Sequence, residues 1–313
     1  MTTMTDATPP IPVLVIGEAL IDIVVPLSGA GSEHVGGSPA NVAVGLARLG
    51  HPTTLATRFG RDERGERIKH LLTDEQVHLA PGSDTAHHTS TALARLDANH
   101  VATYEFDLDW PLQAGGIDLN AGHVHTGSIA ATLLPGAHAV ADVISTCRAT
   151  ATISYDPNVR PSLMGEPSDV AIAIEQLISL ADVVKASEED VQWLYSATPE
   201  EVIDRWAPLG PRLIVITLGA QGALVSIDGR SEYVPATQVE VVDTVGAGDS
   251  FMSGLISGLI DANMLGGLEA RRRLATADLS TVRAAVQRAI ACSSVTVSRA
   301  GSNPPRRAEL TLE

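Results

Sequence analysis

The segment DTVGAGDSFMSGL, residues 243–255, joins a glycine-rich loop to the start of an apolar helix. The preceding stretch TQVEVV, residues 237–242, is predicted to form a strand that leads into the loop. Gly254 and Gly258 would let the helix approach a neighbouring helix closely. One apolar helical face repeats behind the loop, at Met252, Leu255, Ile256, Leu259 and Ile260. The segment therefore predicts a loop that opens a buried helix.

The free backbone N–H groups at the start of this helix, together with the helix dipole, predict an anion-binding loop. A P-loop would need a lysine that the stretch lacks, and a dinucleotide loop would need a small residue where Phe251 stands. Asp249 would also repel a resting phosphate. It either caps the helix or accepts a proton from an alcohol during phosphoryl transfer, while the amides of residues 246–249 stabilise the moving charge.

Continuous apolar strands are predicted at residues 13–17 (VLVIG), 151–156 (ATISYD) and 213–219 (LIVITLG). Helical patterns fall between them, as in residues 167–182, where apolar residues recur at helical spacing. Strands of this kind are buried on both faces. The sequence therefore predicts an α/β fold with a doubly wound, mostly parallel sheet flanked by helices.

Two strand-rich inserts interrupt this alternation. Residues 89–110 read as two strands around a turn at residues 97–99, and residues 24–37 lie between a strand and a helix. We expect lid segments at about 24–35 and 89–108 that pair into a small β-sheet over the main domain, although surface hairpins are the alternative. Such a lid could also join two copies of the chain in a homodimer.

Composition limits the function classes. The 313 residues carry a formal charge of −16 and are 44% hydrophobic, which indicates a globular protein without a nucleic-acid or membrane surface. Two cysteines make no disulfide framework, and the start of the chain is no signal peptide, so a cytoplasmic location is expected. We expect a loose tail over residues 1–10 and one domain over residues 11–313.

The stretch GGSPANVAVGLARLG, residues 36–50, predicts a second helix whose N-terminus follows paired glycines. Ser38 is predicted to cap this helix. Helix chemistry leaves Gly36, Gly37 and Asn41 unexplained. Paired glycines would let a polyol lie against the backbone, and the Asn41 amide can both donate to and accept from hydroxyl groups.

These two stretches resemble the N-terminal and C-terminal signatures of the ribokinase-like, or PfkB, sugar kinase family, and the similarity runs from about residue 11 to 305. The resemblance implies an ATP-dependent sugar kinase in which Asp249 is the catalytic base. Gly246, Ala247 and Gly248 would supply the anion hole. It also implies a sugar site formed by Asp22, Gly36, Gly37 and Asn41.

The resemblance extends to the nucleotide and to cations. Residues 217–225 resemble a nucleotide-binding turn, which would place Thr217, Gly219 and Gly222 beside ATP. Ser187 and Asp190 stand where relatives carry an Asn-x-x-Glu motif that organises Mg²⁺ and phosphate. Asp190 would act on Mg²⁺ through water, or else belong to a helix-capping pattern. Asp243 and residues 298–305 resemble parts of a monovalent-cation site, which suggests K⁺. His123 and His125 are expected to pack in the core or the wall of the site.

The substrate class rests on three stretches, DPNVR (156–160), KASEED (185–190) and HTGSIA (125–130), which most resemble fructokinases. They imply D-fructose, phosphorylated on its primary O6. We expect few cations in the site besides Arg160, which favours a neutral sugar. Arg160 also leaves a 2-keto-3-deoxygluconate kinase open, and a ribokinase, a nucleoside kinase and a silent sugar-binding regulatory protein remain alternatives.

Overall fold

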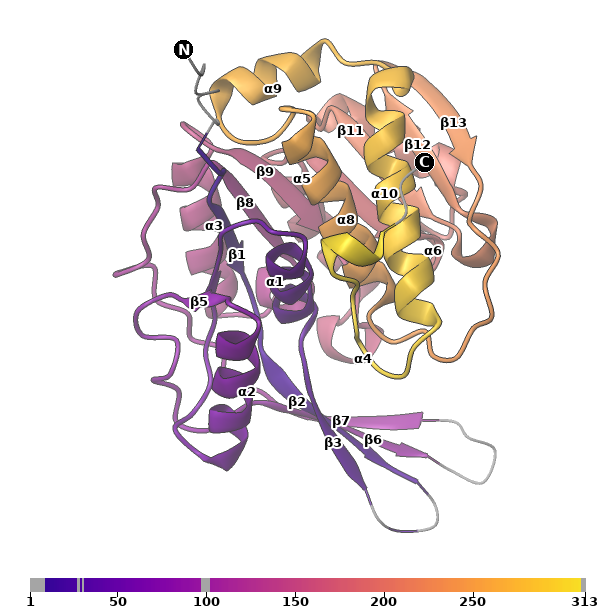
Figure 1. Cartoon of the computed structure of the whole chain (residues 1–313). Coiled ribbons are helices and arrows are strands. Elements are labelled where there is room, and N and C mark those ends of the chain that lie inside the picture. Colours follow the sequence, from indigo (N-terminus) through magenta and orange to yellow (C-terminus); the bar gives the residue numbers. More distant parts are fainter. Residues whose placement is uncertain (1–8, 27–28, 30, 97–101, 311–313) are drawn as a thin grey trace, which may run out of the picture.

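The computed structural model describes residues 9–26, 29, 31–96 and 102–310. Most of the expected tail over residues 1–10, and the whole of the turn expected at residues 97–99, lie outside these ranges. The described chain forms one large sheet covered by helices and one smaller sheet beside it (Figure 1). This arrangement confirms the predicted α/β class.

The large sheet has nine strands, and seven of them run parallel. The last two strands in the chain form an antiparallel hairpin at one edge. In spatial order the strands are β13 (Arg230–Val234), β12 (Ala223–Ile227), β11 (Leu213–Thr217), β10 (Val183–Ser187), β9 (Thr152–Asp156), β8 (His123–Gly127), β1 (Val13–Ile16), β4 (Thr53–Ala56) and β5 (His78–Leu79).

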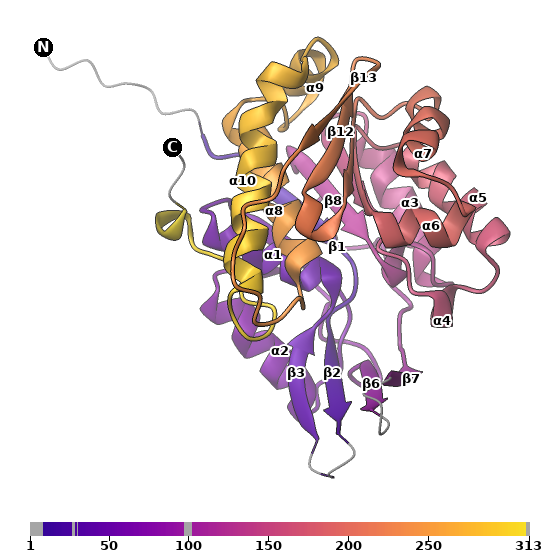
Figure 2. The same cartoon turned by 90° about the vertical axis from the view of Figure 1, so that its right-hand side faces the viewer.

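Helices cover both faces of this sheet, because side chains alternate along each strand. One face packs on α1 (Ser38–Arg48), α2 (Glu63–Asp74), α8 (Ala247–Asp261), α9 (Leu268–Ala275) and α10 (Leu279–Val297). The other packs on α3 (Gly136–Cys147), α5 (Pro167–Ile178), α6 (Glu188–Tyr195) and α7 (Pro199–Trp206). Figure 2 shows α8 and α10 on one side and α5, α6 and α7 on the other.

Short helical elements fill the connections. They are α4 (Pro161–Met164) and the 3₁₀ turns η1 (Ile129–Ala131), η2 (Ala207–Leu209), η3 (Gly219–Gln221) and η4 (Arg307–Glu309). No helix in the described part of the chain is both long and apolar enough to cross a membrane.

The helix that follows the glycine-rich loop is buried, as predicted: residues 249–260 of α8 are all buried. A Cβ on Gly254 would lie 2.8 Å from the Cα of Ala289, and one on Gly258 would lie 2.5 Å from the Cα of Ala285. Both contacts are on α10, so the two glycines allow α8 and α10 to pack backbone against backbone. The predicted close approach is confirmed.

The predicted strand over residues 237–242 is wrong. The segment has no strand partner, and Val239, Val241 and Val242 are exposed. Only its last residue is held, because the Val242 N–H donates to the carbonyl of Val297 at 2.8 Å. The alternating apolar pattern indicated a strand, but β13 is already the edge of the sheet and no further strand pairs with it.

The small sheet contains both inserts and has the order β3 (Ser32–Gly36), β2 (Leu20–Val25), β6 (Thr91–Leu96) and β7 (Ala102–Asp107). It extends away from the large sheet (Figure 1), which confirms a separate small sheet. It begins earlier than expected, since β2 starts at Leu20, and Asp22 therefore lies within a strand. Closure of this sheet as a lid stays a prediction.

Candidate active site

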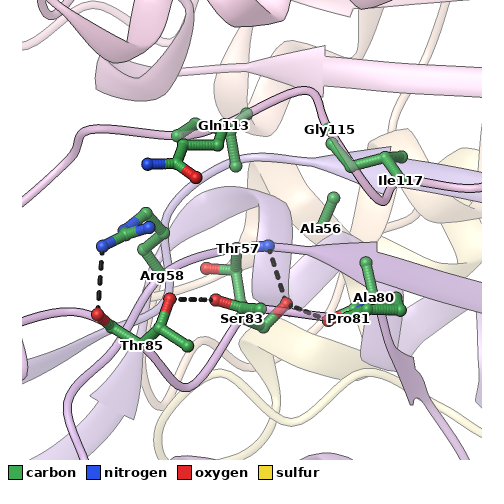
Figure 3. Close-up of a pocket in the computed structure, with 12 residues that line it drawn as sticks. Ala56, Thr57, Arg58, Ala80, Pro81, Ser83, Thr85, Gln113, Gly115 and Ile117 are labelled. Atoms are coloured by element: carbon green, nitrogen blue, oxygen red, sulfur yellow. Dashed lines mark hydrogen bonds between the residues drawn. The ribbon is translucent and has the colours of Figure 1, made fainter.

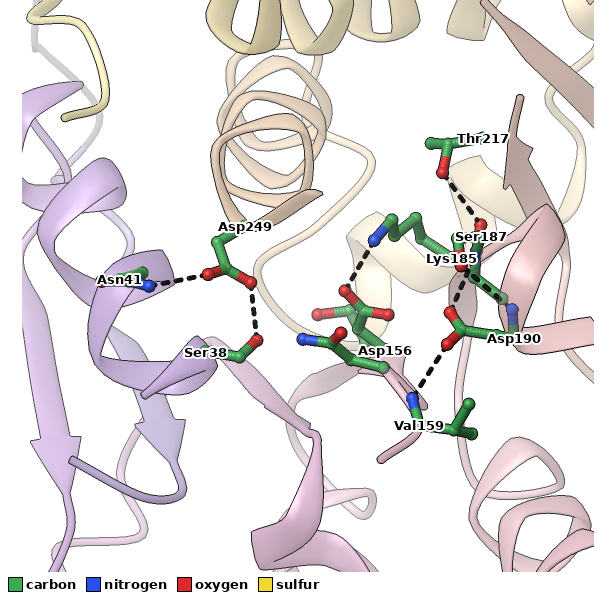
Figure 4. A network of polar contacts seen from close by, with 12 residues as sticks. Ser38, Asn41, Asp156, Val159, Lys185, Ser187, Asp190, Thr217 and Asp249 are labelled. Atoms are coloured by element: carbon green, nitrogen blue, oxygen red, sulfur yellow. Dashed lines mark hydrogen bonds and ion pairs between the residues drawn. The ribbon is translucent and has the colours of Figure 1, made fainter. Parts of the chain in front are cut away.

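The polar residues singled out above meet at the carboxyl edge of the large sheet. Chain order reverses between β1 and β8: β4 and β5 lie on one side of β1, while β8 to β11 lead away on the other. In open α/β sheets, ligands bind at the carboxyl ends of strands where the order reverses. The start of α8 and the start of α1 both face this edge in Figure 4.

The Asp249 side chain is held by two residues at the start of α1. Its Oδ1 accepts a hydrogen bond from Ser38 Oγ at 2.7 Å, and its Oδ2 accepts one from Asn41 Nδ2 at 2.8 Å (Figure 4). The cap of α8 is Gly246 in a left-handed conformation, without a side-chain capping bond. Asp249 therefore does not cap its helix; its buried carboxylate joins α8 to α1.

Ser38 was predicted to cap α1, and this is wrong. The capping position is Gly37, with φ 103°, a value that glycine adopts and serine disfavours. A Cβ on Gly37 would also overlap the carbonyl of Glu18. Ser38 therefore lies inside the first turn and gives its hydroxyl to Asp249 instead.

The first turn of α8 keeps two backbone N–H groups without an acceptor among the described residues. The N–H groups of Gly248 and Asp249 donate to no acceptor in the part of the chain that the structure describes, whereas the Ala247 N–H donates to the Thr244 carbonyl at 3.2 Å. Gly246 permits the turn, because a Cβ there would overlap Ser302. The loop can thus offer an anion two backbone donors and the positive end of a helix of 15 residues.

The carboxylate of Asp22 lies between the small sheet and this edge. It occupies the space that a side chain at Gly36 would need, because a Cβ there would overlap Asp22 Oδ2. Burial raises the pKa of Asp22 to about 6; Arg160 opposes the shift and Asp249 adds to it.

Arg160 follows β9 and caps α4. Its guanidinium donates to the Asn158 carbonyl, the Asn158 Oδ1 and the Val159 carbonyl at 2.7–3.0 Å. Its charge acts on the pKa values of Glu18 and Asp22. Arg160 is therefore oriented by its own loop.

Glu18 is a site residue that the sequence reasoning missed. It is 5% exposed, lies two residues after the end of β1, and its Oε2 accepts a hydrogen bond from the Ala130 N–H at 3.1 Å. Burial raises its pKa to about 7 against the opposing effects of Ser128 and Arg160. A polar residue that follows a buried strand of a parallel sheet was the available signal.

A buried ion pair is the second feature that was missed. Lys185 Nζ donates to Asp156 Oδ2 at 2.9 Å, with the two side chains 4% and 0% exposed. A Cβ on Gly248 would lie 3.0 Å from the same Nζ. Lys185, which the sequence reasoning did not name, is thus a second cation beside Arg160 and lies next to the anion loop (Figure 4).

Ser187 and Asp190 form the capping box of α6. Ser187 Oγ accepts from the Asp190 N–H at 3.1 Å, and Asp190 Oδ2 accepts from the Ser187 N–H at 2.8 Å. Asp190 Oδ1 accepts from the Val159 N–H at 2.9 Å. Both carboxylate oxygens thus accept hydrogen bonds from backbone donors, so the capping pattern considered from the sequence is present.

The predicted nucleotide-binding turn lies between β11 and β12. Thr217 ends β11 and donates to the Ala186 carbonyl at 3.3 Å. Gly219 and Gly222 both have positive φ, of 55° and 110°, and a Cβ on Gly222 would overlap the Val234 carbonyl. These glycines keep the turn tight beside the carboxyl end of β11.

Asp243 holds two loops together. Its Oδ1 accepts from the Val245 N–H at 3.0 Å and its Oδ2 from the Gly301 N–H at 2.8 Å. The segments predicted to share a cation site, Asp243 and residues 298–305, are therefore adjacent.

His123 and His125 pack in the core, as expected. His123 contacts Thr152 and Ser154, and His125 contacts Ser154, all at 2.9 Å. Burial lowers the pKa of each to about 3, so both are neutral at neutral pH. Among the described residues, no cluster of His, Cys, Asp and Glu could hold a metal ion.

A separate pocket opens beyond β4 and is unrelated to these residues (Figure 3). Arg58 crosses it to donate to the Thr85 carbonyl at 3.1 Å, and Ser83 Oγ donates to the Ala80 carbonyl at 2.8 Å. None of the predicted site residues lines it.

The doubly wound sheet, the small second sheet and the buried acid at an anion-binding helix define a ribokinase-like kinase. Residues 12–308 match the pfkB family carbohydrate kinase, and the chain belongs to this family. A fructokinase of Klebsiella pneumoniae is 34% identical over 257 residues, which cover 78% of this chain and 83% of that protein.

Solved structures agree with this assignment. A fructokinase double mutant from Vibrio cholerae O395, with fructose, ADP and a potassium ion bound, has a TM-score of 0.78 and 30% identity and covers 93% of both chains. A fructokinase from Xylella fastidiosa with bound ATP has a TM-score of 0.80 and 27% identity, again covering 93% of both chains. The predicted family is therefore confirmed, and the protein is a carbohydrate kinase.

Proposed function

We propose that the protein transfers the γ-phosphoryl group of ATP to the primary O6 hydroxyl of D-fructose, with Asp249 as the general base. The observation that carries the proposal is the position of Asp249: a buried carboxylate directly beside backbone N–H groups at the start of α8 that have no acceptor in the described chain. An acid in such a place suits a reaction in which an alcohol meets a phosphoryl group. The fructokinase relatives supply the choice of sugar.

In the proposed step the O6 oxygen attacks the γ-phosphorus in line and forms a new O–P bond. The bond from the γ-phosphorus to the β–γ bridging oxygen breaks, and ADP leaves with that electron pair. Asp249 accepts the hydroxyl proton, which contributes a rate factor of about 10²–10⁴. The amides of Gly248 and Asp249 donate to the transferred group. Ser38 and Asn41 keep the carboxylate turned towards the alcohol.

The other end of the sugar would lie against the small sheet. Asp22 can accept hydrogen bonds from two neighbouring hydroxyls. Gly36 and Gly37, which have no room for side chains, let the ring approach the backbone. Closure of residues 24–35 and 89–108 over the sugar would exclude water from the phosphoryl group. The free edges of the same sheet offer a route to a homodimer.

The nucleotide would bind beyond the anion loop, next to Thr217, Gly219 and Gly222, with Ser187 nearby. Magnesium arriving with ATP would spread the charge of the phosphates. Asp190 would reach that ion through water, because its own oxygens already accept backbone hydrogen bonds. Asp243 and the loop at Gly301 would form a potassium site, supported by the potassium-bound relative.

A panel of acceptors tests the proposal. Purified protein is assayed for ADP release with fructose, ribose, 2-keto-3-deoxygluconate and adenosine, each in the presence of Mg²⁺. Fructose should give the highest kcat/KM by at least about tenfold, or 1.4 kcal/mol of transition-state discrimination. A better result with 2-keto-3-deoxygluconate would assign Arg160 to a substrate carboxylate. Absence of ADP release with every acceptor would favour a silent sugar-binding protein.

A further inference from the structure

The ion pair of Lys185 and Asp156 lies in an unusual place for a purely structural contact. Side chains alternate along β10, so Lys185 shares a face with Val183 and points towards α8 rather than towards α6. The ammonium stops beside Gly248, where a Cβ would lie 3.0 Å from Nζ. Glycine at this position is what allows the cation to reach the first turn of α8.

The ammonium also has N–H donors that make no hydrogen bond within the described chain. It carries three protons, and in the described chain it donates only to Asp156 Oδ2. Burial acts to lower the pKa of Lys185, but Asp156, Asp190 and Asp249 outweigh it and hold that pKa above its ordinary value. Lys185 is therefore a charged donor enclosed by protein. The Oδ1 atom of Asp156 is buried without a hydrogen-bond partner.

A buried charge of this kind costs free energy that a neutral pair would not. Replacement of a buried ion pair by neutral residues of similar shape is often neutral or stabilising. The guanidinium of Arg160, the other cation at this edge, already donates hydrogen bonds within its own loop, to Asn158 and Val159. Lys185, in contrast, lies against the first turn of α8, beside Gly248.

We infer that Lys185 is a further catalytic residue, which donates a hydrogen bond to an oxygen of the phosphoryl group in transfer, and that Asp156 is the positioning residue that aims it. The inference rests on the proposed function. The ammonium completes a three-donor cradle with the amides of Gly248 and Asp249. It stabilises charge that is largest in the transition state and takes part in no covalent step.

The test compares a neutral pair with a matched control pair. Lys185→Met/Asp156→Asn removes both charges, so neither a buried cation nor a buried carboxylate is left without its counter-charge, and we expect the variant to fold. Asp182→Asn/Arg271→Met removes a second ion pair of 2.8 Å, at the amino end of β10 and away from α8. Wild type, Lys185→Met, Asp156→Asn and both double variants are compared by kcat, by the Kd for fructose and by urea unfolding.

The Lys185→Met/Asp156→Asn variant should lose about 10²–10³ in kcat, as expected for one anion-hole donor. Its Kd for fructose should stay within about threefold of wild type, because the sugar is held elsewhere. The variant should also fail to gain affinity for ADP when aluminium fluoride, a planar mimic of the transferred group, is added with fructose. Asp182→Asn/Arg271→Met should change stability alone.

Full turnover by a folded Lys185→Met/Asp156→Asn variant, within about threefold of wild type, would overturn the inference and leave the pair a structural contact. The inference also fails if Asp182→Asn/Arg271→Met loses as much kcat, since the effect would then belong to any buried pair on β10. Absence of sugar phosphorylation by wild type would instead overturn the proposed function, and the inference with it.

Discussion

Replacement of Asp249 by asparagine separates a catalytic acid from a structural one, because the two side chains have nearly the same shape. The carboxylate accepts hydrogen bonds from Ser38 Oγ and Asn41 Nδ2. An asparagine can still accept from Asn41 through its oxygen. Its amide group can donate to Ser38, whose hydroxyl both donates and accepts. The variant therefore has a satisfied arrangement in the same space.

The expected loss of stability is small. Two charge-assisted hydrogen bonds become neutral ones, at roughly 1 kcal/mol each. The favourable interaction of the carboxylate with the start of α8 adds about 0.3–1 kcal/mol. A total of about 2–3 kcal/mol leaves a domain of ordinary stability, about 5–15 kcal/mol, folded. Unfolding therefore cannot account for a large loss of activity.

The loss of activity should be large, because asparagine cannot accept the proton of the alcohol. We expect kcat for fructose, measured by ADP release, to fall by at least about 10²-fold. Ser38→Ala is the matched control: it removes one hydrogen bond to the same carboxylate but keeps the base, and should cost less than about tenfold. Near wild-type turnover by Asp249→Asn would refute the role of Asp249 as a base.

Three further outcomes follow from the structure. Gly258→Ala should destabilise the fold by about 1–3 kcal/mol in urea unfolding, because its Cβ would press on the backbone of Ala285. Gly115→Ala, where the added Cβ would lie in open space, should change the free energy of unfolding little. Equal effects of the two substitutions would refute the close packing of α8 on α10. Between pH 4.5 and about 7 the free energy of unfolding of the wild type should fall by up to about 3 kcal/mol because of Glu18. Burial raises the pKa of this carboxyl to about 7, so the folded protein keeps the proton at pH values where the unfolded chain has already released it. The Glu18→Gln variant should lack this part of the slope, and identical slopes would refute the assignment. Excess EDTA should abolish ADP release and added Mg²⁺ should restore it, since few protein cations face the phosphates; full turnover in EDTA would contradict this reasoning.

Much of the fold follows from local patterns in the sequence. Apolar runs bounded by polar residues mark the parallel strands, and the inserts stand out because their alternation differs from that of the rest of the chain. The stretch at residues 237–242 shows the limit of this reasoning. Its alternation resembles a strand, but a strand also needs a partner, and none is available beyond β13.

The candidate site was predictable where one motif contains the chemistry. Asp249 stands directly after the glycines that expose the amides, so the sequence alone shows a carboxylate placed beside an anion-binding loop. Ser38 was misread because its intrinsic capping preference is overridden by a contact with Asp249, 211 positions away. Local propensity contains no information about such a partner.

The pair of Lys185 and Asp156 could not be deduced in the same way. Asp156 ends β9 and Lys185 lies in the middle of β10, and neither position alone indicates the partner. Their contact depends on the parallel pairing of β9 with β10 and on the absence of a side chain at Gly248. The sheet order, which no local pattern specifies, brings the two charges together beneath α8.

The position of the new phosphate on the sugar tests the proposed reaction most directly. Fructose labelled with ¹³C at carbon 6 is incubated with ATP, Mg²⁺ and the enzyme, and the product is followed by ¹³C and ³¹P NMR. We predict fructose 6-phosphate, seen as phosphorus coupling on the labelled carbon, with one ADP formed for each phosphorylated sugar. Phosphate on another carbon, or ADP without a phosphorylated sugar, would contradict the proposed reaction.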